Sequence, residues 1–374
     1  MRRIKVMSVF GTRPEAVKMC PLIKEFETRD GIDSVVVLTG QHREMLDSVM
    51  AEFGIAADFD LDIMRPVQSL SGIMAEVLTR LDPVLADVSP DIVLVHGDTT
   101  TSTAAAIASF HRRIPVGHVE AGLRTHNKYS PFPEEMNRTI TSRIATLHFA
   151  PTENNRDSLT AEGVSAESVY VTGNTVIDAF RYTVRGGYEF VAPELRELDF
   201  SRGRFITLTA HRRENHGEGI ESICRAVLTL TERYRDLTVV YPVHLSPAVR
   251  ETVFPLLGGR ERIVLTDPLG VADMHNLLAR SYLVLTDSGG IQEEAPSLGI
   301  PVLVLRRETE RPEAVAAGTV KIAGIGCGGI VKAASSLLDD KAARDKMARA
   351  VNPYGDGRAS ARIADAIISY FQKN

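Results

Sequence analysis

The sequence predicts an α/β protein built from two doubly wound parallel-sheet domains of similar size. Short apolar runs rich in Val and Ile alternate with amphipathic segments along most of the 374 residues. This alternation is typical of buried parallel strands connected by helices. It weakens once, over residues 181–204, where Gly186-Gly187, Pro193 and many charges indicate a linker. Two Rossmann-like halves follow from that single interruption.

The first half contains six expected strands with helical periodicity between them. The strands are Ile4–Phe10, Ser34–Thr39, Asp91–Val95, Pro115–Val119, Leu147–Ala150 and Val169–Thr172. The helices include Pro14–Glu27, Gln41–Phe53 and Ser71–Val88.

The second half repeats this organisation. Its expected strands are Phe205–Thr209, Thr238–Tyr241, Ile263–Thr266, Leu283–Thr286, Val302–Leu305 and Val320–Ala323. Its helices include Gly219–Arg233, Ala272–Ala279 and Ile330–Leu338. A last helix, Arg358–Phe371, has no strand after it, and its own pattern does not choose the half on which it packs.

Composition excludes several classes of protein. Hydrophobic residues make up 44% and charged residues 24%, so a disordered, collagen-like or disulfide-scaffold chain is excluded. The 43 Lys and Arg against 48 Asp and Glu give a net charge of −5, which argues against a nucleic-acid partner. Cys20, Cys224 and Cys327 are too far apart for a zinc knot or a disulfide framework. Without a signal peptide or an apolar run of about 18 residues, we expect a cytoplasmic protein with no membrane partner.

Three carboxylates follow strands in the first half. Asp98 and Glu120 come after the third and fourth strands, and Glu134 stands at a helix start after two prolines. Because ligands bind at the carboxyl ends of parallel strands, we expect these groups in one crevice, equipped for acid–base chemistry. The alternatives are a helix N-cap for Asp98 and dipole complementation for first-turn acids, which we favour for Glu135. Arg13, beside a capped helix N-terminus, indicates an anion site.

The second half offers phosphate-binding chemistry at its strand ends. His211, Arg212 and a second arginine follow one strand, and His244 ends the next. The strongest local signal is Ser288-Gly289-Gly290 between a strand and a helix, where backbone amides would hold a diphosphate. Glu294, one turn later, is placed to reach ribose hydroxyls, and Arg311 adds a polar contact.

One glycine motif predicts no function. Residues 324–329 match G-x-G-x-x-G, but the following helix leads to another helix and to no second βαβ strand. A working dinucleotide site needs that strand and an acidic residue about 20 positions further on. We therefore expect no NAD, and the absence of GxxxxGK[ST] argues against a P-loop enzyme.

At these positions the chain resembles the non-hydrolysing UDP-N-acetylglucosamine 2-epimerases over essentially its whole length. The matching segments are Phe10–Ala16, Gln41–Arg43, Val95–Thr100, Gly117–Arg124, Ser130–Glu135, His211–Glu214, Asp287–Ser297 and Asn352–Gly357. Jointly these motifs are very specific.

The resemblance implies a GT-B-like fold with two domains facing a central cleft, in a homodimer. It implies an N-terminal domain of residues 1–178, a UDP-binding domain of residues 179–355, and a C-terminal helix within 356–374 that packs back on the first domain. It implies a cytoplasmic isomerase that interconverts UDP-GlcNAc and UDP-ManNAc for bacterial surface-polysaccharide synthesis.

The resemblance also implies roles for the candidate residues. It places Asp98, Glu120 and Glu134 in the acid/base set and His211 near the leaving phosphate. It places Arg13 and the 288–290 segment on the diphosphate and Glu294 on the ribose. Which carboxylate serves which face of C2 stays open.

The chemistry allows two routes to inversion, because the C2 proton of the starting sugar is not acidic. Transient oxidation at C3 would need NAD, which the missing dinucleotide fingerprint disfavours. Elimination of UDP to a 2-acetamidoglucal, followed by re-addition, needs only acid/base groups and charge stabilisation. We therefore expect no NAD and no metal.

Many bacterial members of the family are activated by a second UDP-GlcNAc. The corresponding positions here are Gln41, His42, Gln68, Arg212 and His244. Some members have Arg where this chain has Val67, which bears on the strength of activation.

Three other functions are compatible with parts of the pattern. A UDP-sugar glycosyltransferase would share the fold and the nucleotide site but does not require three carboxylates around C2. A hydrolysing epimerase would release free ManNAc and UDP. A catalytically inactive nucleotide-sugar sensor would not need Asp98, Glu120, Glu134 and His211.

Overall fold

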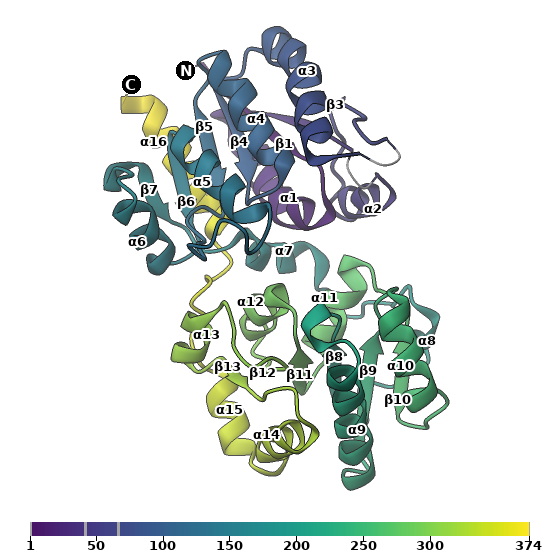
Figure 1. Cartoon of the computed structure of the whole chain (residues 1–374). Helices are drawn as coiled ribbons and strands as arrows, with labels where there is room; N and C mark the ends of the chain where they lie inside the picture. Colours follow the sequence, from purple (N-terminus) through teal and green to yellow (C-terminus); the bar gives the residue numbers. More distant parts are fainter. Residues whose placement is uncertain (1, 41–42, 66–67, 374) are drawn as a thin grey trace. The chain divides into compact units, whose positions relative to one another are not determined.

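The chain folds into two α/β units, described by a computed structural model for residues 2–40, 43–65 and 68–373. Unit 1 consists of residues 1–182 and 354–374, and unit 2 of residues 183–353 (Figure 1). Each unit has its own parallel sheet with helices between successive strands. The predicted fold class, two doubly wound parallel-sheet domains, is confirmed.

Unit 1 is built on a seven-stranded parallel sheet in the order β3-β2-β1-β4-β5-β6-β7. Its strands are β1 (Ile4–Phe10), β2 (Ile32–Leu38), β3 (Phe59–Asp60), β4 (Ile92–His96), β5 (Val116–Val119), β6 (Leu147–Ala150) and β7 (Val169–Val171). The strand order reverses between β1 and β4, so the loops after these two strands diverge and leave a crevice at their carboxyl ends.

The helices of unit 1 pack their apolar sides on this sheet. They are α1 (Arg13–Glu27), α2 (Arg43–Phe53), α3 (Leu70–Val88), α4 (Thr100–His111), α5 (Glu134–Ile144), α6 (Glu153–Ala161), α7 (Thr175–Thr183) and α16 (Ala359–Lys373). Fully buried Val9 and Val93 of the central strands share one core cluster with Leu81 of α3 and Ala105 of α4. This burial holds the strand ends, and therefore the loops that follow them, at fixed positions.

Unit 2 repeats the topology with a six-stranded parallel sheet in the order β10-β9-β8-β11-β12-β13. Its strands are β8 (Arg204–Thr209), β9 (Leu237–Pro242), β10 (Ile263–Thr266), β11 (Leu283–Thr286), β12 (Val302–Val304) and β13 (Val320–Ile322). Its helices are α8 (Pro193–Arg196), α9 (Glu218–Arg233), α10 (Pro247–Leu257), α11 (Val271–Ala279), α12 (Gly289–Ser297), α13 (Pro312–Ala317), α14 (Cys327–Asp339) and α15 (Lys341–Ala348). The order reverses between β8 and β11.

The strands lie within two residues of their predicted positions, with one omission. Strand β3 has only two residues, Phe59 and Asp60, on the edge of the sheet. Two residues carry no alternation of apolar and polar side chains, so periodicity could not reveal them.

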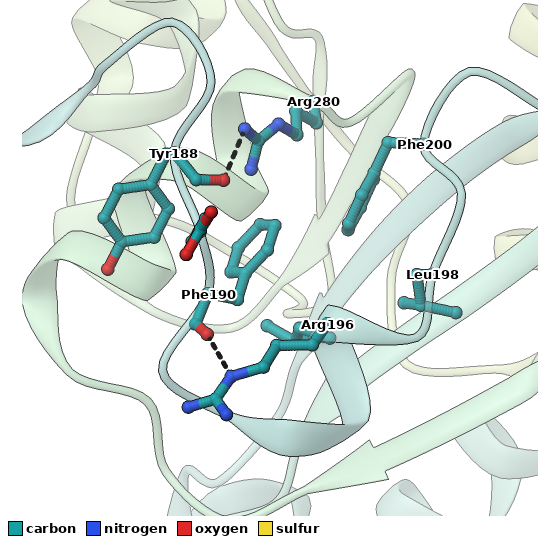
Figure 2. A pocket seen from close by; sticks show the side chains of 8 residues that line it. Tyr188, Phe190, Arg196, Leu198, Phe200 and Arg280 are labelled. Carbon is teal, nitrogen blue, oxygen red and sulfur yellow. Dashed lines mark hydrogen bonds between the residues drawn. The ribbon is translucent and has the colours of Figure 1, made fainter.

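The prediction of a linker over residues 181–204 is wrong, because residues 183–204 belong to unit 2 and most of them pack within it. The Phe190 ring stacks on the Phe200 ring with centroids 5.2 Å apart, and the Arg280 guanidinium lies 4.7 Å from the Phe190 ring centre. Figure 2 shows these side chains around a pocket of about 480 Å³. Burial of Phe190 and Leu195 outweighs the Gly and Pro residues that indicated a flexible connection.

The described residues carry few features of a membrane, metal or redox protein. No helix among them is long and apolar enough to cross a membrane. The same residues hold no group of three His, Cys, Asp or Glu side chains placed to bind a metal ion. The three cysteines are free, and burial raises the pKa of Cys224 to about 12, which keeps that thiol protonated.

The last helix, α16, packs in unit 1 and is held there by Asp178 of α7 (Figure 1). The two Asp178 carboxylate oxygens accept the backbone N–H groups of Ala359 and Ser360 at 3.1 and 2.8 Å. These are the first two residues of α16, whose N–H groups have no partner inside the helix. A side chain 181 residues away therefore caps the C-terminal helix.

Replacing Asp178 by Ala should destabilise unit 1. Asp178 is 2% exposed, so the change leaves two buried N–H groups without an acceptor, at a cost of roughly 1–3 kcal/mol. Asp178→Asn keeps one acceptor and should lose less. Urea unfolding followed by circular dichroism measures both, with exposed Asp157→Ala as the control. An unchanged midpoint for Asp178→Ala would contradict the capping role.

Candidate active site

A buried carboxylate, Glu15, joins the two loops that diverge at the crevice of unit 1. Its Oε2 accepts the backbone N–H groups of Gly11 and Thr12 at 3.0 and 2.8 Å. Its Oε1 accepts the hydroxyls of Thr99 and Ser102 at 2.7 and 3.0 Å. The first pair follows β1 and the second pair begins α4 after β4. One side chain, 2% exposed, therefore sets the distance between the two strand-end loops.

Thr12 caps α1 in a reciprocal arrangement with Glu15. The Thr12 hydroxyl accepts the Glu15 N–H, while the Glu15 carboxylate returns to the Thr12 N–H. Arg13 is the first residue of this helix and is half-buried. Its position at a capped helix N-terminus is compatible with the anion-binding role that the sequence predicts.

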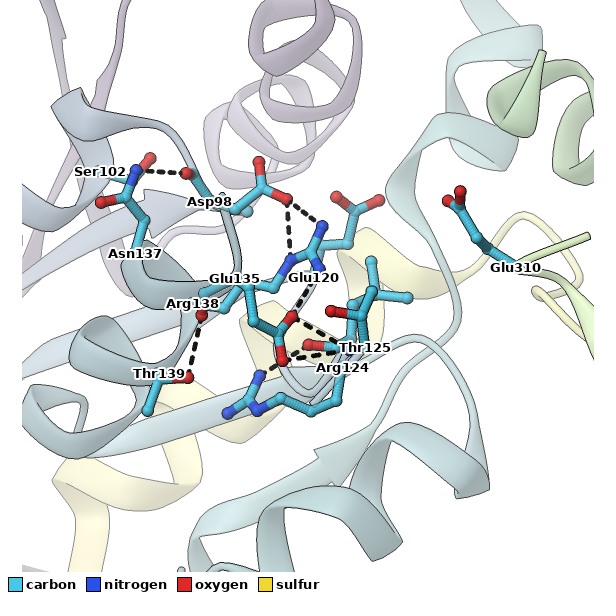
Figure 3. Close-up of polar contacts among 12 residues, drawn as sticks. Asp98, Ser102, Glu120, Arg124, Thr125, Glu135, Asn137, Arg138, Thr139 and Glu310 are labelled. Carbon is cyan, nitrogen blue, oxygen red and sulfur yellow. Dashed lines mark hydrogen bonds and ion pairs between the residues drawn. The ribbon is translucent and has the colours of Figure 1, made fainter. Parts of the chain in front are cut away.

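Asp98 is available for chemistry because Thr99, not Asp98, caps α4. The Thr99 hydroxyl accepts the Ser102 N–H at 3.0 Å, so the N-cap alternative for Asp98 is wrong. The Asp98 Oδ2 instead accepts two bonds from Arg138 of α5, at 2.9 and 2.6 Å. Figure 3 shows this pair at the end of the strands. Two guanidinium N–H groups on one carboxylate oxygen fix the orientation of the Asp98 side chain.

Glu135 has a structural role. Its carboxylate accepts the backbone N–H groups of Thr125 and His126 and an Arg138 N–H at 3.1 Å (Figure 3). Burial acts to raise the pKa of Glu135, but the two backbone bonds and the Arg138 charge outweigh it and hold that pKa below its usual value. Glu135 thus anchors the 125–126 turn, which goes beyond the dipole role that we favoured.

Glu120 is the most constrained carboxylate of the site. Its backbone φ is +63°, a left-handed conformation that non-glycine residues adopt at a cost. Its Oε1 accepts an Asn174 side-chain N–H at 2.9 Å and forms an ion pair with Lys18 of α1. The side chain is 8% exposed. A lysine and an amide on one oxygen favour the ionised carboxylate and leave Oε2 for other partners.

His96 faces that second oxygen. Its Nε2 lies 3.6 Å from Glu120 Oε2 and has no hydrogen-bond partner among the described residues. Burial is the main cause that lowers the pKa of His96; the Lys18 charge lowers it further, and Glu120, Glu15 and Asp98 oppose the shift. We infer a neutral imidazole beside Glu120. The charges of Asp98 and Glu120 therefore both act on the buried imidazole of His96.

Glu134 is the first residue of α5, one turn before Arg138. Residues four apart share a helix side, so Glu134 lies on the side of α5 that carries the Arg138–Asp98 pair. Its Oε2 is buried and has no hydrogen-bond partner within the described ranges. A buried carboxyl oxygen without a hydrogen bond costs folding free energy, so a purely structural role does not explain it. Such an oxygen is suited to exchange a proton with a ligand.

The glycines beside Glu120 have structural explanations. A Cβ on Gly122, where φ is +94°, would lie 2.2 Å from the Asn155 carbonyl oxygen. A Cβ on Gly97, where φ is +63°, would lie 3.5 Å from Glu120 Oε2. At Gly122 the neighbouring Asn155 backbone therefore occupies the space that a side chain would need.

In unit 2 the corresponding crevice is organised by Asp287, which follows β11. Its Oδ2 accepts the N–H groups of His211 and Arg212, both at 2.8 Å, and an Asn215 amide N–H at 2.9 Å. These residues follow β8, so Asp287 joins the two loops at the strand reversal. Its Oδ1 lies 3.3 Å from His211 Nδ1.

The α12 N-terminus has two guanidinium groups beside it. A Cβ on Gly289 would lie 3.6 Å from Arg311 Nη2 and 3.7 Å from Arg212 Nη2. Arg311 is held by an ion pair with buried Glu293, and Arg212 lies 3.7 Å from Glu310. Ser288 is the N-cap residue and does not bond the helix with its side chain. A helix N-terminus with two guanidinium groups beside it is the arrangement that the predicted diphosphate site requires.

Glu294 lies next to this site on α12. A Cβ on Gly290 would be 3.2 Å from its Oε1, and its Oε2 lies 3.7 Å from His275 Nε2. The structure therefore brings together His211, Arg212, Ser288-Gly289-Gly290, Glu294 and Arg311, as the strand-end rule predicts.

The positions of the predicted activating site are divided between the units. Gln68 belongs to unit 1, where its Nε2 donates to the Ile63 carbonyl at 2.7 Å. Arg212 and His244 belong to unit 2, where the His244 ring stacks on His211 at 5.3 Å. Gln41 and His42 lie outside the described residues, as does Val67. The activating site stays a prediction.

Sequence reasoning missed Glu15, Lys18, His96, Arg138 and Asn174 as parts of the site. Two signals were present. Glu15 and Lys18 are three apart on α1, so they share one side of the helix near its N-terminus. Asn174 follows β7 by three residues, and the strand-end rule could have included it.

Comparisons with known proteins agree on one family. A family model described as UDP-N-acetylglucosamine 2-epimerase matches residues 24–368. The UDP-N-acetylglucosamine 2-epimerase of Bacillus subtilis is 53% identical over 371 residues, which cover 99% of this chain and 97% of that protein.

Solved structures give the same result. A Staphylococcus aureus protein solved with UDP has a TM-score of 0.89 at 48% identity, covering 99% of this chain and 97% of its own. The Neisseria meningitidis UDP-GlcNAc 2-epimerase, solved with UDP-GlcNAc, has a TM-score of 0.86 at 46% identity, covering 98% of this chain and 100% of its own. With a family model across most of its length and relatives near half identity, the chain belongs to the UDP-N-acetylglucosamine 2-epimerase family.

Proposed function

We propose that this protein interconverts UDP-GlcNAc and UDP-ManNAc by eliminating and re-adding UDP, without NAD or a metal and without net hydrolysis. The observation that carries this proposal is the pair of oriented carboxylates at the strand reversal of unit 1, half-buried Asp98 and Glu120, whose side chain is 8% exposed. Relatives solved with UDP and with UDP-GlcNAc support the choice of ligand.

The reaction balances without an added reagent. The C1–O bond breaks and its electron pair leaves on the β-phosphate oxygen of UDP, while a carboxylate takes the C2 proton. A C1–C2 double bond forms, giving 2-acetamidoglucal. Re-addition of a β-phosphate oxygen of the retained UDP to C1, with a proton delivered to the opposite face of C2, completes the inversion.

The carboxylates of unit 1 differ in the environment that each oxygen meets. Glu120 pairs with the Lys18 ammonium and accepts an Asn174 N–H, which suits it to accept a proton in one direction. Asp98 is neutralised by Arg138, and Glu134 has a buried unbonded oxygen. Groups with different environments have different proton affinities, which a two-sided exchange at C2 requires. The assignment of each carboxyl to a face stays open.

The leaving group is stabilised by unit 2 in this proposal. Negative charge grows on the diphosphate as the C1–O bond breaks. The α12 N-terminus, Arg212 and Arg311 supply positive potential that is in place before the reaction, which is the usual basis of electrostatic catalysis. His211, whose Nδ1 lies 3.3 Å from Asp287 Oδ1, supplies a further donor in this proposal.

Five further features that the family resemblance implies stay predictions. They are the homodimer, activation by a second UDP-GlcNAc, Arg13 on the diphosphate, a cytoplasmic location, and supply of surface-polysaccharide synthesis. The glycosyltransferase and the hydrolysing epimerase remain the competing functions, and the next experiment separates them.

A proton NMR time course in D2O with UDP-GlcNAc, and no added NAD or metal, tests the proposal. We expect UDP-ManNAc to accumulate with deuterium entering C2 of both sugars, because the removed proton exchanges with solvent. Accumulation of free ManNAc with UDP would indicate hydrolysis instead. An unchanged spectrum at high enzyme concentration would reject epimerisation and would favour the glycosyltransferase or the inactive sensor instead.

Neutralising either oriented carboxylate should abolish exchange at C2. We expect Asp98→Asn and Glu120→Gln to lower the epimerisation rate by about 100- to 10,000-fold, the usual range for loss of an acid–base group. UDP affinity, measured by calorimetry, should stay within about threefold, because the diphosphate site belongs to unit 2. Glu25→Gln on the other end of α1 is the matched control. Near-normal turnover in either variant would remove that residue from the mechanism.

A further inference from the structure

We propose that Asp287 is a positioning residue that fixes the His211 proton on Nδ1 and leaves Nε2 to face the bound diphosphate. This inference rests on the proposed function for its purpose, but the geometry behind it is independent of the reaction. It concerns two groups that the strand reversal of unit 2 brings together.

The two oxygens of Asp287 have unequal environments. Oδ2 accepts three N–H bonds, from His211, Arg212 and Asn215, and so is fully used. Oδ1 is buried and has no hydrogen-bond partner among the described residues. Asp287 itself is 0% exposed. An unbonded carboxylate oxygen at this depth is expensive, and structure alone does not require it.

The group placed to bond Oδ1 is the imidazole of His211. The distance from Oδ1 to His211 Nδ1 is 3.3 Å, slightly long for a hydrogen bond. The backbone N–H of His211 is already bonded to the same carboxylate. Ring and backbone of one residue are therefore held by one side chain, which restricts how the ring can turn.

The other neighbours of His211 act against its protonation. Burial is the main cause that lowers the pKa of His211, and His244, Arg212 and His216 lower it further. Asp287 is the group that opposes them by raising that pKa. The His244 ring stacks on His211 with an interplanar angle of 15°. Its Nδ1 accepts the Ser246 N–H at 3.1 Å, so its orientation is also fixed.

The consequence is a defined proton arrangement beside the diphosphate. With Nδ1–H directed to Asp287, Nε2 is the nitrogen that gains a proton when an anion binds. The resulting imidazolium donates from Nε2 to a phosphate oxygen while Asp287 balances its charge. As the C1–O bond breaks, this donor strengthens without moving.

The tautomer of His211 tests the proposal without any turnover. Nitrogen-15 NMR of histidine-labelled full-length protein, with the His211 signal identified by its loss in His211→Asn, reports which ring nitrogen carries hydrogen. We expect Nδ1–H in the wild type above the pKa of His211. An Nε2–H tautomer there would overturn the proposal, and this measurement needs no Asp287 variant to fold.

Asp287→Asn supplies the second test. The Asn oxygen can still accept the three donors that hold the loop, but its NH2 group now faces Nδ1 and should drive His211 to the Nε2–H tautomer. As pH rises, affinity for UDP should fall when His211 loses its proton. In the variant this fall should occur at a lower pH than in the wild type, because the imidazolium has lost its counter-charge. The fall should also be shallower, because neutral Nε2–H still donates.

A matched control separates positioning from folding. Asp273 is also a buried aspartate of unit 2 that accepts two backbone N–H groups, from Val191 and Ala192, and a tyrosine hydroxyl. Asp273→Asn should change stability but leave the pH profile of UDP affinity in place. Coincident profiles for the wild type and Asp287→Asn would overturn the proposal. Failure of epimerisation in D2O would reject the proposed function alone, since neither the tautomer measurement nor the UDP-binding measurement requires the reaction.

Discussion

The structure depends on one buried carboxylate at the strand reversal of each sheet. In unit 1, Glu15 holds the loop after β1 to the loop before α4 through four bonds. In unit 2, Asp287 holds the loop after β8 to the end of β11 through three. Parallel strands leave diverging loops where their order reverses, and these loops have backbone N–H groups without sheet partners. A carboxylate satisfies several of them at once.

The candidate site residues occupy positions that these two carboxylates fix. Asp98 follows β4 directly, within the loop that Glu15 restrains, and Glu120 is held by Lys18 on the same helix as Glu15. The left-handed backbone of Glu120 costs free energy. Its side chain is held in place by three neighbours, Lys18, Asn174 and His96. In unit 2, Arg212 and His211 are bonded by their backbone to Asp287, beside the α12 N-terminus. Fixed geometry of this kind lowers the reorganisation that a reaction requires.

Much of this arrangement was predictable from the order of strands and the residues that follow them. Val- and Ile-rich runs located every strand except two-residue β3, and strand ends located Asp98, Glu120, His211 and Ser288. What the pattern could not show is which polar side chain pairs with which. Either Asp98 or Thr99 could cap α4 by residue type, and only the bond from Ser102 decides for Thr99.

The other features that the sequence did not predict depend on contacts between residues far apart in the chain. Residues 183–204 look like a linker by Gly and Pro content, yet their aromatic rings find partners, including Arg280, that come much later in the chain. Lys18 and Glu120 are 102 residues apart, and Asp178 caps a helix 181 residues away. Local periodicity reports which face of an element is buried, but not the distant group that meets it.

The central claim, that the C1–O bond breaks and reforms while UDP stays bound, has a direct measurement. UDP-GlcNAc carrying oxygen-18 in the bridge between C1 and the β-phosphate is incubated with the enzyme and followed by phosphorus NMR. The account predicts that the label moves from the bridge to the non-bridging β-phosphate positions while UDP-ManNAc forms, because the free β-phosphate can rotate before re-addition. Complete epimerisation with the label still in the bridge would contradict it.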